Sequence, residues 1–427
     1  MGGNDSERRA DARPITLALT AAVFLAYFDR AVPSAGAAML RRELALDDAA
    51  LGFAISTAAA LAYATVAIGM ALIDGGRWRR APILIGMTLW TAGAVSLAFA
   101  ATWRSYVAGE LAIGAGQGLF VPAAATLIAN SGCDAALGRA TARFTTASTT
   151  GRSSAVLVTG LLIAMLLTLE WRVPGVVADW RGVFLITAAP NLALLAVLAW
   201  WRPTTPAPSP RPTPATEASP SGPGWIGFIG CAASAIAPVM MIQSIGAWYP
   251  LLLTRSAGMT PAHAAMLAGA ATLMATPLGQ WLGGRWLDRH PSWRRWPVRT
   301  VAPALILSGA AIAALGAESA PAAAAALVIA DLALGVAALA GLAAVQSITP
   351  LMRRRRANSL FFALITLIGV GLAPLLTGAL SDLGGASGPA LARALGAIAA
   401  AALLIATIGH LLCRASLRYR TQPVPTD

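Results

Sequence analysis

Long apolar stretches follow one another along almost the whole sequence, and they constrain the fold more than any other feature. A helix needs about 20 mostly apolar residues to cross the hydrocarbon core of a bilayer. The chain has 427 residues and is 57% hydrophobic and 11% charged, whereas globular proteins carry about 25% charged residues. We therefore predict an all-α membrane protein with twelve transmembrane helices. The predicted spans are residues 14–40, 49–73, 81–102, 104–130, 141–169, 181–201, 225–253, 261–287, 298–317, 321–349, 357–381 and 388–413.

A polar, proline-rich segment interrupts this series near its middle. Residues 203–224 (PTTPAPSPRPTPATEASPSGPG) contain eight prolines and almost no large apolar side chain. Such a composition is typical of an extended linker. We therefore predict an N-terminal bundle of six helices over residues 14–202, a linker over 203–224, and a C-terminal bundle of six helices over 225–413.

The distribution of arginine predicts the orientation in the membrane. If the N-terminus is cytoplasmic, the loops assigned to the cytoplasm hold 22 arginines and the outer loops hold 7. Cytoplasmic loops of membrane proteins are enriched in Lys and Arg. We therefore expect both termini in the cytoplasm and a multi-pass protein of the inner (cytoplasmic) cell membrane. The same rule explains the net charge of +13, so we expect no nucleic-acid partner.

The two halves of the chain carry related loop sequences. GMALIDGGRWRR (Gly69 to Arg80) lies at the end of the second predicted span and in the loop after it, and GGRWLDRHPSWRR (Gly283 to Arg295) lies at the end of the eighth and in the loop after it. Their acidic residues, Asp74 and Asp288, lie 214 positions apart, which is about half the chain. This pattern predicts two parallel repeats. Transporters built in this way bind substrate near the midplane, between the repeats.

Several short stretches, in order, resemble the major facilitator superfamily over residues 14–413. They include Tyr27-Phe28-Asp29-Arg30, GAWYPLLLTRSAGMT (Gly246 to Thr260) and LIGVGLAPLLTGALSD (Leu367 to Asp382). Within the superfamily the chain is most similar to the Spinster-like transporters, with the anion:cation symporters close behind. The resemblance implies two six-helix bundles and transport by alternating access.

The resemblance also implies a cytoplasmic gate at the loop motif G-x-x-x-D-R-x-x-R-R. The second-half copy keeps the glycine, the acid and the first arginine, and the first-half copy keeps the acid but has Met70 and Gly75 at two motif positions. A purely local role at helix ends is the alternative. The predicted gate residues are Asp74, Arg79, Arg80, Gly284, Asp288 and Arg289.

Five ionisable residues fall inside predicted spans, where a charge costs at least about 2.5–3.5 kcal/mol. They are Asp29, Arg30, Glu110, Arg152 and Asp331. We expect a switchable cluster in which Arg30 pairs with Glu110 and Asp29 competes for the same guanidinium. The alternative is a static ion pair that locks the two helices together. The resembling branches carry a Glu at Gln117, so Glu110 is our candidate replacement for that proton carrier. The predicted proton-coupling residues are Asp29, Glu110 and Asp331.

Arg152 lies too deep in its span to reach the cytoplasmic surface easily. The sequence around it, TTASTTGRSS (Thr145 to Ser154), is rich in hydroxyl groups and predicts the wall of a hydrated cavity. A guanidinium there suits a carboxylate or phosphate, and a structural bridge to Asp29, Glu110 or Asp331 is the alternative. The predicted substrate-binding residues are Arg152, Arg30, Gln117, Gln243, Tyr249, Ser148 and Thr149.

The sequence lacks the signatures of other functions. There is no phosphate-binding G-x-x-x-x-G-K-[ST] motif, no metal-ligand spacing among the cysteines and histidines, and no nucleophile–base arrangement. We therefore expect no enzyme, no cofactor and no metal.

The sequence therefore favours a monomeric secondary active transporter, or symporter, for an organic or amphipathic anion, either lysolipid-like or a carboxylate. Its expected partners are this small-molecule or lipid-like substrate, protons and the bilayer. The alternatives are efflux of hydrophobic neutral or cationic compounds, and a membrane sensor that has lost transport.

Overall fold

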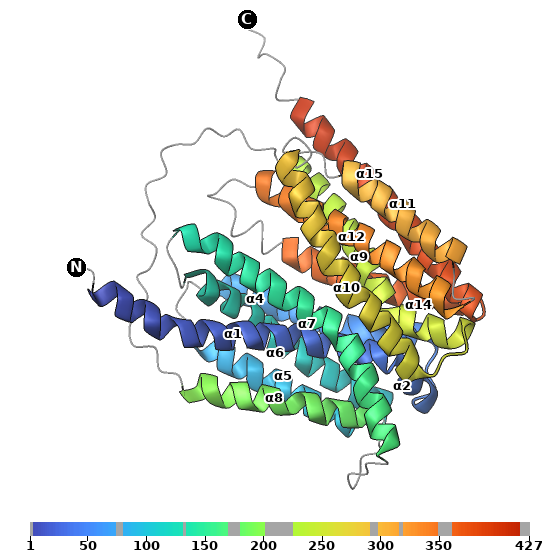
Figure 1. Cartoon of the computed structure of the whole chain (residues 1–427), viewed down its shortest axis with the longest axis horizontal. Helices are drawn as coiled ribbons and strands as arrows, with labels where there is room; N and C mark the ends of the chain where they lie inside the picture. The colour runs from blue at the N-terminus through green and yellow to red at the C-terminus, as the bar shows by residue number, and fades with distance from the viewer. Residues whose placement is uncertain are drawn as a thin grey trace, which may run out of the picture.

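The structure is a computed structural model that describes residues 3–73, 80–130, 134–169, 180–200, 225–290, 298–315, 319–348 and 361–418. These residues form helices joined by turns, and no β-strand occurs among them (Figure 1). The predicted linker, 203–224, lies outside the described residues.

The elements of the first half cover six of the predicted spans. They are α1 (Gly3–Ala35), α2 (Ala37–Glu43), α3 (Asp48–Gly52), the π-helix η1 (Phe53–Thr57), α4 (Ala58–Ile73), α5 (Ala81–Ala98), α6 (Trp103–Asn130), α7 (Asp134–Thr168) and α8 (Trp180–Trp200).

The elements of the second half cover the other six. They are α9 (Trp225–Ser256), α10 (Pro261–Arg289), α11 (Val298–Leu315), α12 (Ala320–Ile348), the π-helix η4 (Ile365–Leu372), α14 (Ala373–Leu383) and α15 (Gly388–Arg418).

Ten helical segments among the described residues are long and apolar enough to cross a membrane. Two predicted spans, 261–287 and 298–317, are not among the ten. The apolar part of α11, Val298–Ala313, is shorter, and α10 carries polar side chains on the face that lines a cavity. The all-helical membrane fold is therefore observed, and the number twelve stays a prediction.

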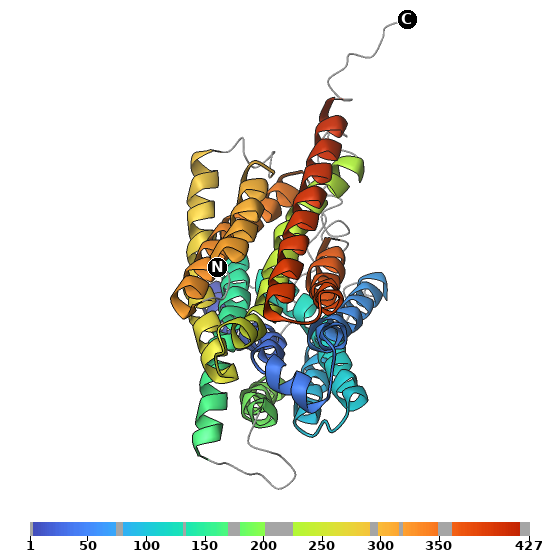
Figure 2. The ribbon, with the colours of Figure 1, turned by 90° about the vertical axis from the view of Figure 1, so that its right-hand side faces the viewer.

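The helices of the two halves form two sets that lie side by side. Within the first set α5 packs on α6 and α8, and α1 packs on α7; within the second set α9 packs on α15 and α12. The sets meet where α7 contacts α10, α1 contacts α9 and α3 contacts α14. They lie close together near α2 and α14 and diverge away from that end (Figure 1). The helices of the two sets are steeply inclined to each other. In Figure 2, α8 of the first set is seen almost end-on, whereas α15 of the second set runs vertically.

Glycines allow the closest of these helix contacts. A Cβ atom on Gly86 of α5 would lie 2.6 Å from the carbonyl oxygen of Gly116 on α6. Between the sets, a Cβ on Gly160 of α7 would lie 2.8 Å from the backbone nitrogen of Met266 on α10. Membrane helices use small residues in this way because close packing, rather than the hydrophobic effect, holds them together in lipid.

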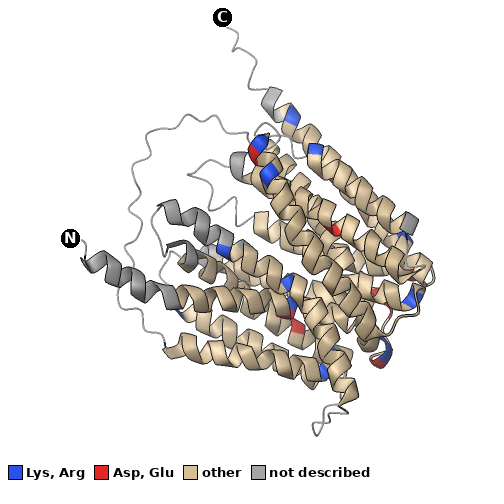
Figure 3. Cartoon of the chain, viewed as in Figure 1, with Lys and Arg blue, Asp and Glu red and all other residues tan. Residues whose placement is uncertain are grey.

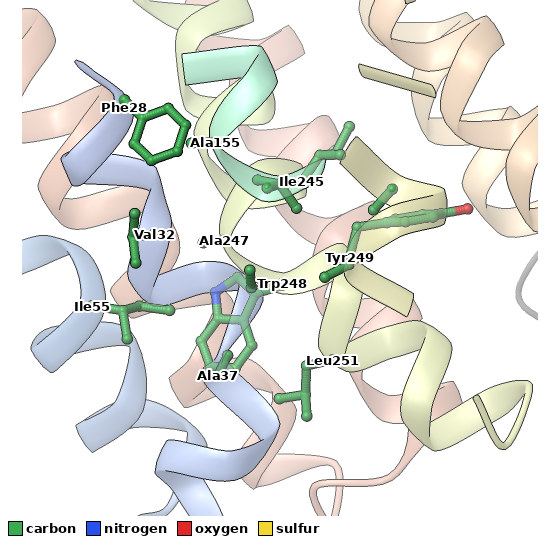
Figure 4. Close-up of a cluster of buried hydrophobic side chains, with 14 of the residues drawn as sticks. Phe28, Val32, Ala37, Ile55, Ala155, Ile245, Ala247, Trp248, Tyr249 and Leu251 are labelled. Atoms are coloured by element: carbon green, nitrogen blue, oxygen red, sulfur yellow. The ribbon is translucent and has the colours of Figure 1, made fainter. Parts of the chain in front are cut away.

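A continuous apolar core joins the sets. Figure 4 shows side chains of α1, α2, η1, α7 and α9 gathered in one cluster, with Trp248 between Ala37 and Ala247. Trp248 is fully buried, and its indole N–H donates to the carbonyl oxygen of Pro374, at 2.9 Å. The indole of Trp248 therefore packs inside the protein and does not face lipid.

Charged side chains are sparse in the helical interior and gather towards helix ends (Figure 3). Each of the few charged side chains that are buried needs a partner or a function.

Candidate functional site: a cavity between the two helix sets

A cavity of about 290 Å³ lies between the sets, lined by residues of α1, η1, α4, α7, α9, α10, α12 and the η4 region. It lies where the repeat pattern predicted a substrate site. Seven predicted site residues line it, namely Arg30, Ser148, Thr149, Arg152, Gln243, Tyr249 and Asp331. Asp29, Glu110 and Gln117 do not line it and lie inside the first set.

Arg152 presents its guanidinium to this cavity from α7. Among the described residues no side chain or carbonyl forms a hydrogen bond or ion pair with it. Its Nη2 atom lies 3.0 Å from where a Cβ on Gly246 would be, so the glycine makes room for the guanidinium against α9. Arg152 also interacts electrostatically with Asp331 across the cavity, without forming an ion pair. The guanidinium therefore keeps its donors available for a ligand.

Arg30 is held in place by its own helix set. Its Nε and Nη2 atoms donate to Oε1 of Gln117, at 3.0 and 2.7 Å, and Gln117 donates in turn to the carbonyl oxygen of Ala26, at 2.8 Å. The guanidinium also lies 4.8 Å from the ring centre of Tyr63 and 5.6 Å from that of Tyr27. Gln117 thus positions Arg30 from behind instead of facing the cavity itself.

Asp29 points away from Arg30, into the space between α1, α5 and α8. Its Oδ2 atom accepts hydrogen bonds from the indole N–H of Trp90, at 2.9 Å, and from the side-chain amide of Asn191, at 2.6 Å. Its other oxygen is buried and has no partner among the described residues. The adjacent charges of span one therefore belong to two separate sites, because neighbouring side chains on a helix point about 100° apart.

The expected ion pair between Arg30 and Glu110 does not form. Gln117, two turns further along the same helix face, occupies the Arg30 guanidinium in its place. Glu110 is buried beside Tyr106, and its Oε1 atom has no hydrogen-bond partner within the described ranges. Two buried carboxylates in the first set, Asp29 and Glu110, thus each keep one unpaired oxygen.

The second set contributes one carboxylate to the cavity. Asp331 of α12 accepts a hydrogen bond from the Thr272 hydroxyl of α10, at 2.7 Å. Tyr249 donates its hydroxyl to the carbonyl oxygen of Ala323, at 2.7 Å, so its ring rather than its hydroxyl is the group available to a ligand. Gln243 is buried, and its Oε1 atom lacks a partner in the described part of the chain.

The predicted cytoplasmic gate is only partly visible. Asp74 and Arg79 lie outside the described residues. Arg80 donates to the carbonyl oxygen of Ala199, which joins the start of α5 to the end of α8 within one set. Gly284, Asp288 and Arg289 lie in the last turns of α10.

Sequence reasoning missed several residues that build the site. Thr272, Thr276 and Gln280 of α10 line the cavity at a spacing of four residues, which places them on one helix face. That spacing was a readable signal. Asn191 was also readable, since it is an amide within an apolar span.

No group of three or more His, Cys, Asp or Glu side chains in the described ranges could hold a metal ion.

Comparison with known proteins shows which family and which solved structures this chain resembles. Residues 19–337 match the sequence profile of the Major Facilitator Superfamily. No curated protein matches the sequence significantly. Among solved structures, the fold is similar to that of a bacterial homologue of the human lysosomal transporter Spinster. The inward-facing, unoccupied form has a TM-score of 0.79 at 21% identity, and the inward-facing, occupied form has 0.77 at 20%; both cover 97% of this chain and 99% of the other.

More distant structures share the fold too. A D-xylose–proton symporter has a TM-score of 0.66 at 18% identity, covering 92% of this chain and 96% of its own. A structure of a proton-dependent oligopeptide transporter has a TM-score of 0.69 at 14% identity, covering 96% of this chain and 99% of its own. The likeness to the Spinster-like branch that the sequence motifs indicated is thus confirmed at the level of the fold. The chain belongs to the Major Facilitator Superfamily of transporters.

Proposed function

We propose that this protein is a secondary active transporter that moves an organic or amphipathic anion by alternating access, coupled to protons. The observation that carries the proposal is Arg152, whose guanidinium faces a cavity between the two helix sets and has no hydrogen-bond or ion-pair partner among the described residues. A cation inside a membrane span is costly when it has no partner, so this guanidinium favours a ligand that supplies the opposite charge. Arginine binds carboxylates and phosphates through two parallel hydrogen bonds.

The rest of the cavity wall favours an amphipathic anion over a small one. Val156, Ile242, Ile245 and Phe362 line the cavity together with Arg152 and Arg30. Pockets of this kind bury most of a ligand against apolar side chains and orient it through a few polar groups. A lysolipid-like molecule fits that pattern, with its anionic group at Arg152. A small carboxylate would use only the charged part of the wall.

Proton coupling is supported by the three buried carboxylates. Asp29, Glu110 and Asp331 lie in spans where an ionised group costs free energy, and a proton removes that cost. Asp29 and Glu110 each have one carboxylate oxygen without a hydrogen-bond partner among the described residues, and that oxygen is able to bind a proton. Two fold relatives are named as proton-dependent or proton symporters, which agrees with such coupling without transferring it.

The same proposal includes the membrane arrangement expected from the sequence. It has twelve spans in two six-helix bundles, over residues 14–202 and 225–413, with both termini in the cytoplasm. It also includes a monomer in the inner membrane and a cytoplasmic gate at the loop motifs.

Efflux of a hydrophobic cation is the second candidate, and one observation favours it. Asp331 lines the same cavity, and the aromatic ring of Tyr249 lies on its wall. A carboxylate beside an aromatic face is a typical site for an organic cation.

Ligand-dependent thermal unfolding of the purified protein separates the two candidates. We expect lysophosphatidic acid to stabilise the wild type, by about 2.7 kcal/mol at a concentration one hundred times its Kd. Arg152→Gln should lose that stabilisation. Arg143→Gln, which removes an exposed arginine of the same helix, should keep it. Stabilisation by tetraphenylphosphonium that survives in Arg152→Gln and vanishes in Asp331→Asn would instead establish the cation site.

A further inference from the structure

A buried charge cluster connects the two helix sets at the end of the molecule near α2 and α14. Asp48, the first residue of α3, is fully buried. Its carboxylate accepts two hydrogen bonds from Arg255 at the end of α9, at 2.5 and 2.7 Å, and one from Ser381 of α14, at 2.7 Å. Arg41 of α2 donates to the same carboxylate, at 2.9 Å. One carboxylate thus binds three side chains, two of which belong to the other set.

A second carboxylate strengthens the same junction. Asp382, at the end of α14, accepts hydrogen bonds from the backbone N–H groups of Asp48 and Ala49, at 3.0 and 2.8 Å. The first N–H groups of a helix have no partner within the helix, so Asp382 supplies one from the opposite set. The positive end of the helix dipole adds to this attraction.

Close packing and hydroxyl contacts continue the junction towards the cavity. A Cβ on Gly52 would lie 2.8 Å from the carbonyl oxygen of Pro374, so α3 and α14 approach here without room for a side chain. Thr57 donates to the carbonyl oxygen of Gly371, at 2.8 Å, and Ser56 donates to that of Val370. Both carbonyls belong to the π-helix η4. Ser56 and Val370 also line the cavity, so the junction forms its wall on this side.

We propose that Asp48 is the hub of a gate that closes this side of the cavity, and that alternating access requires its bonds to Arg255 and Ser381 to break. This inference rests on transport by alternating access. The arginine distribution assigns this end, with Arg41 and Arg255, to the exterior. The gate is therefore distinct from the loop-motif gate predicted at the cytoplasmic end.

Electrostatics predict how replacing Asp48 with Asn changes the balance between the closed and the open state. In the closed state Asp48→Asn leaves Arg255 half-buried opposite a neutral group, and removing one partner of such a pair is strongly destabilising. In the open state Arg255 reaches water and needs no partner. The substitution therefore penalises the closed state selectively and raises the open population.

Distances between spin labels test the gate directly. Labels at positions 42 and 393, both exposed, report the separation of the two sets in a variant with Ala at Cys133, Cys231 and Cys413. We expect Asp48→Asn to raise the ratio of long to short distances at least about tenfold, which corresponds to 1.4 kcal/mol. Asp47→Asn, which changes the neighbouring exposed carboxylate, should leave the ratio unchanged. An unchanged ratio in a folded Asp48→Asn protein would overturn the proposal.

Two further variants keep the test decisive if Asp48→Asn does not fold. Arg255→Gln and Ser381→Ala remove the partners from the opposite set, and each should shift the ratio in the same direction. The double variant Asp48→Asn/Arg255→Gln should shift it no further than one single variant, because both remove the same interaction. Additive shifts would contradict a shared bond. The distances are measured without substrate, so a negative result for the gate does not contradict anion transport. A negative result for anion transport likewise does not contradict the gate.

Discussion

At the scale of single residues, the charges inside the helix sets have different surroundings. Arg152 faces the cavity with no partner in the described residues, whereas Arg30 is fixed by Gln117. Asp29 lies behind the cavity wall, where Trp90 and Asn191 hold one of its oxygens and leave the other unpaired. This division suggests that substrate and proton are bound at different places.

Replacing Asp29 with Asn should uncouple transport from protons. Asn keeps the shape and an acceptor oxygen for Trp90 and Asn191, but it cannot bind the coupling proton. One proton per cycle supports up to about a tenfold accumulation per unit of pH difference. We expect Asp29→Asn proteoliposomes to lose that accumulation and to retain exchange at equal pH. Asp47→Asn serves as the control, and gradient-driven accumulation that survives in Asp29→Asn would show that the proton binds elsewhere.

The sequence predicted some of these residues and missed others for a physical reason. The hydroxyl-rich stretch around Arg152 indicated a cavity wall, and Arg152 lies there. The expected pair of Arg30 with Glu110 was wrong, because two groups on one face of α6 competed for the guanidinium and Gln117 lay within reach. Hydropathy indicates how deep a residue lies in the membrane, but not which other helices pack against its own. Contacts such as that between Asp29 and Asn191 are therefore inaccessible from one sequence.

At the scale of elements, apolar length predicted where helices lie, but not where they deviate. The first predicted span, 14–40, breaks at Gly36 into α1 and α2. The spans at 49–73 and 357–381 contain the π-helices η1 and η4, which face each other across the two sets. Thr57 of η1 donates to the carbonyl oxygen of Gly371 in η4, a contact between residues more than 300 positions apart. Composition carries no trace of such a contact.

Helix packing gives a stability prediction for α5 and α6. Gly86→Ala would place a Cβ 2.6 Å from the Gly116 carbonyl oxygen and 2.9 Å from the Phe120 nitrogen, both backbone atoms that cannot rotate away. Overpacking of this kind costs about 1–3 kcal/mol. We expect a lower unfolding temperature by tryptophan fluorescence in detergent.

Gly396→Ala provides the matched control for that measurement. A Cβ at Gly396 meets nothing within 4 Å, and alanine favours a helix over glycine by about 1 kcal/mol. This variant should unfold at or above the wild-type temperature. Equal unfolding temperatures for the two variants would show that the contact between α5 and α6 is looser than the structure indicates.

At the scale of the whole molecule, two helix sets enclose a cavity that is sealed at one end by the Asp48 cluster. Superfamily membership was predictable because the repeat, the loop motif and the apolar spans are all properties of the sequence. The seal was not predictable, since it joins residues from opposite halves.

Flux of lysophosphatidic acid into proteoliposomes tests most directly whether the cavity transports an anion through Arg152. The measurement is the fraction of labelled lysolipid that external albumin cannot extract. For the wild type and for Arg143→Gln we expect a protected fraction well above that of protein-free liposomes. For Arg152→Gln we expect an initial rate at least about tenfold lower, because the charge-assisted contact is lost. A wild type that binds the lysolipid without protecting it from albumin, or an Arg152→Gln variant with the wild-type rate, would contradict anion transport through Arg152.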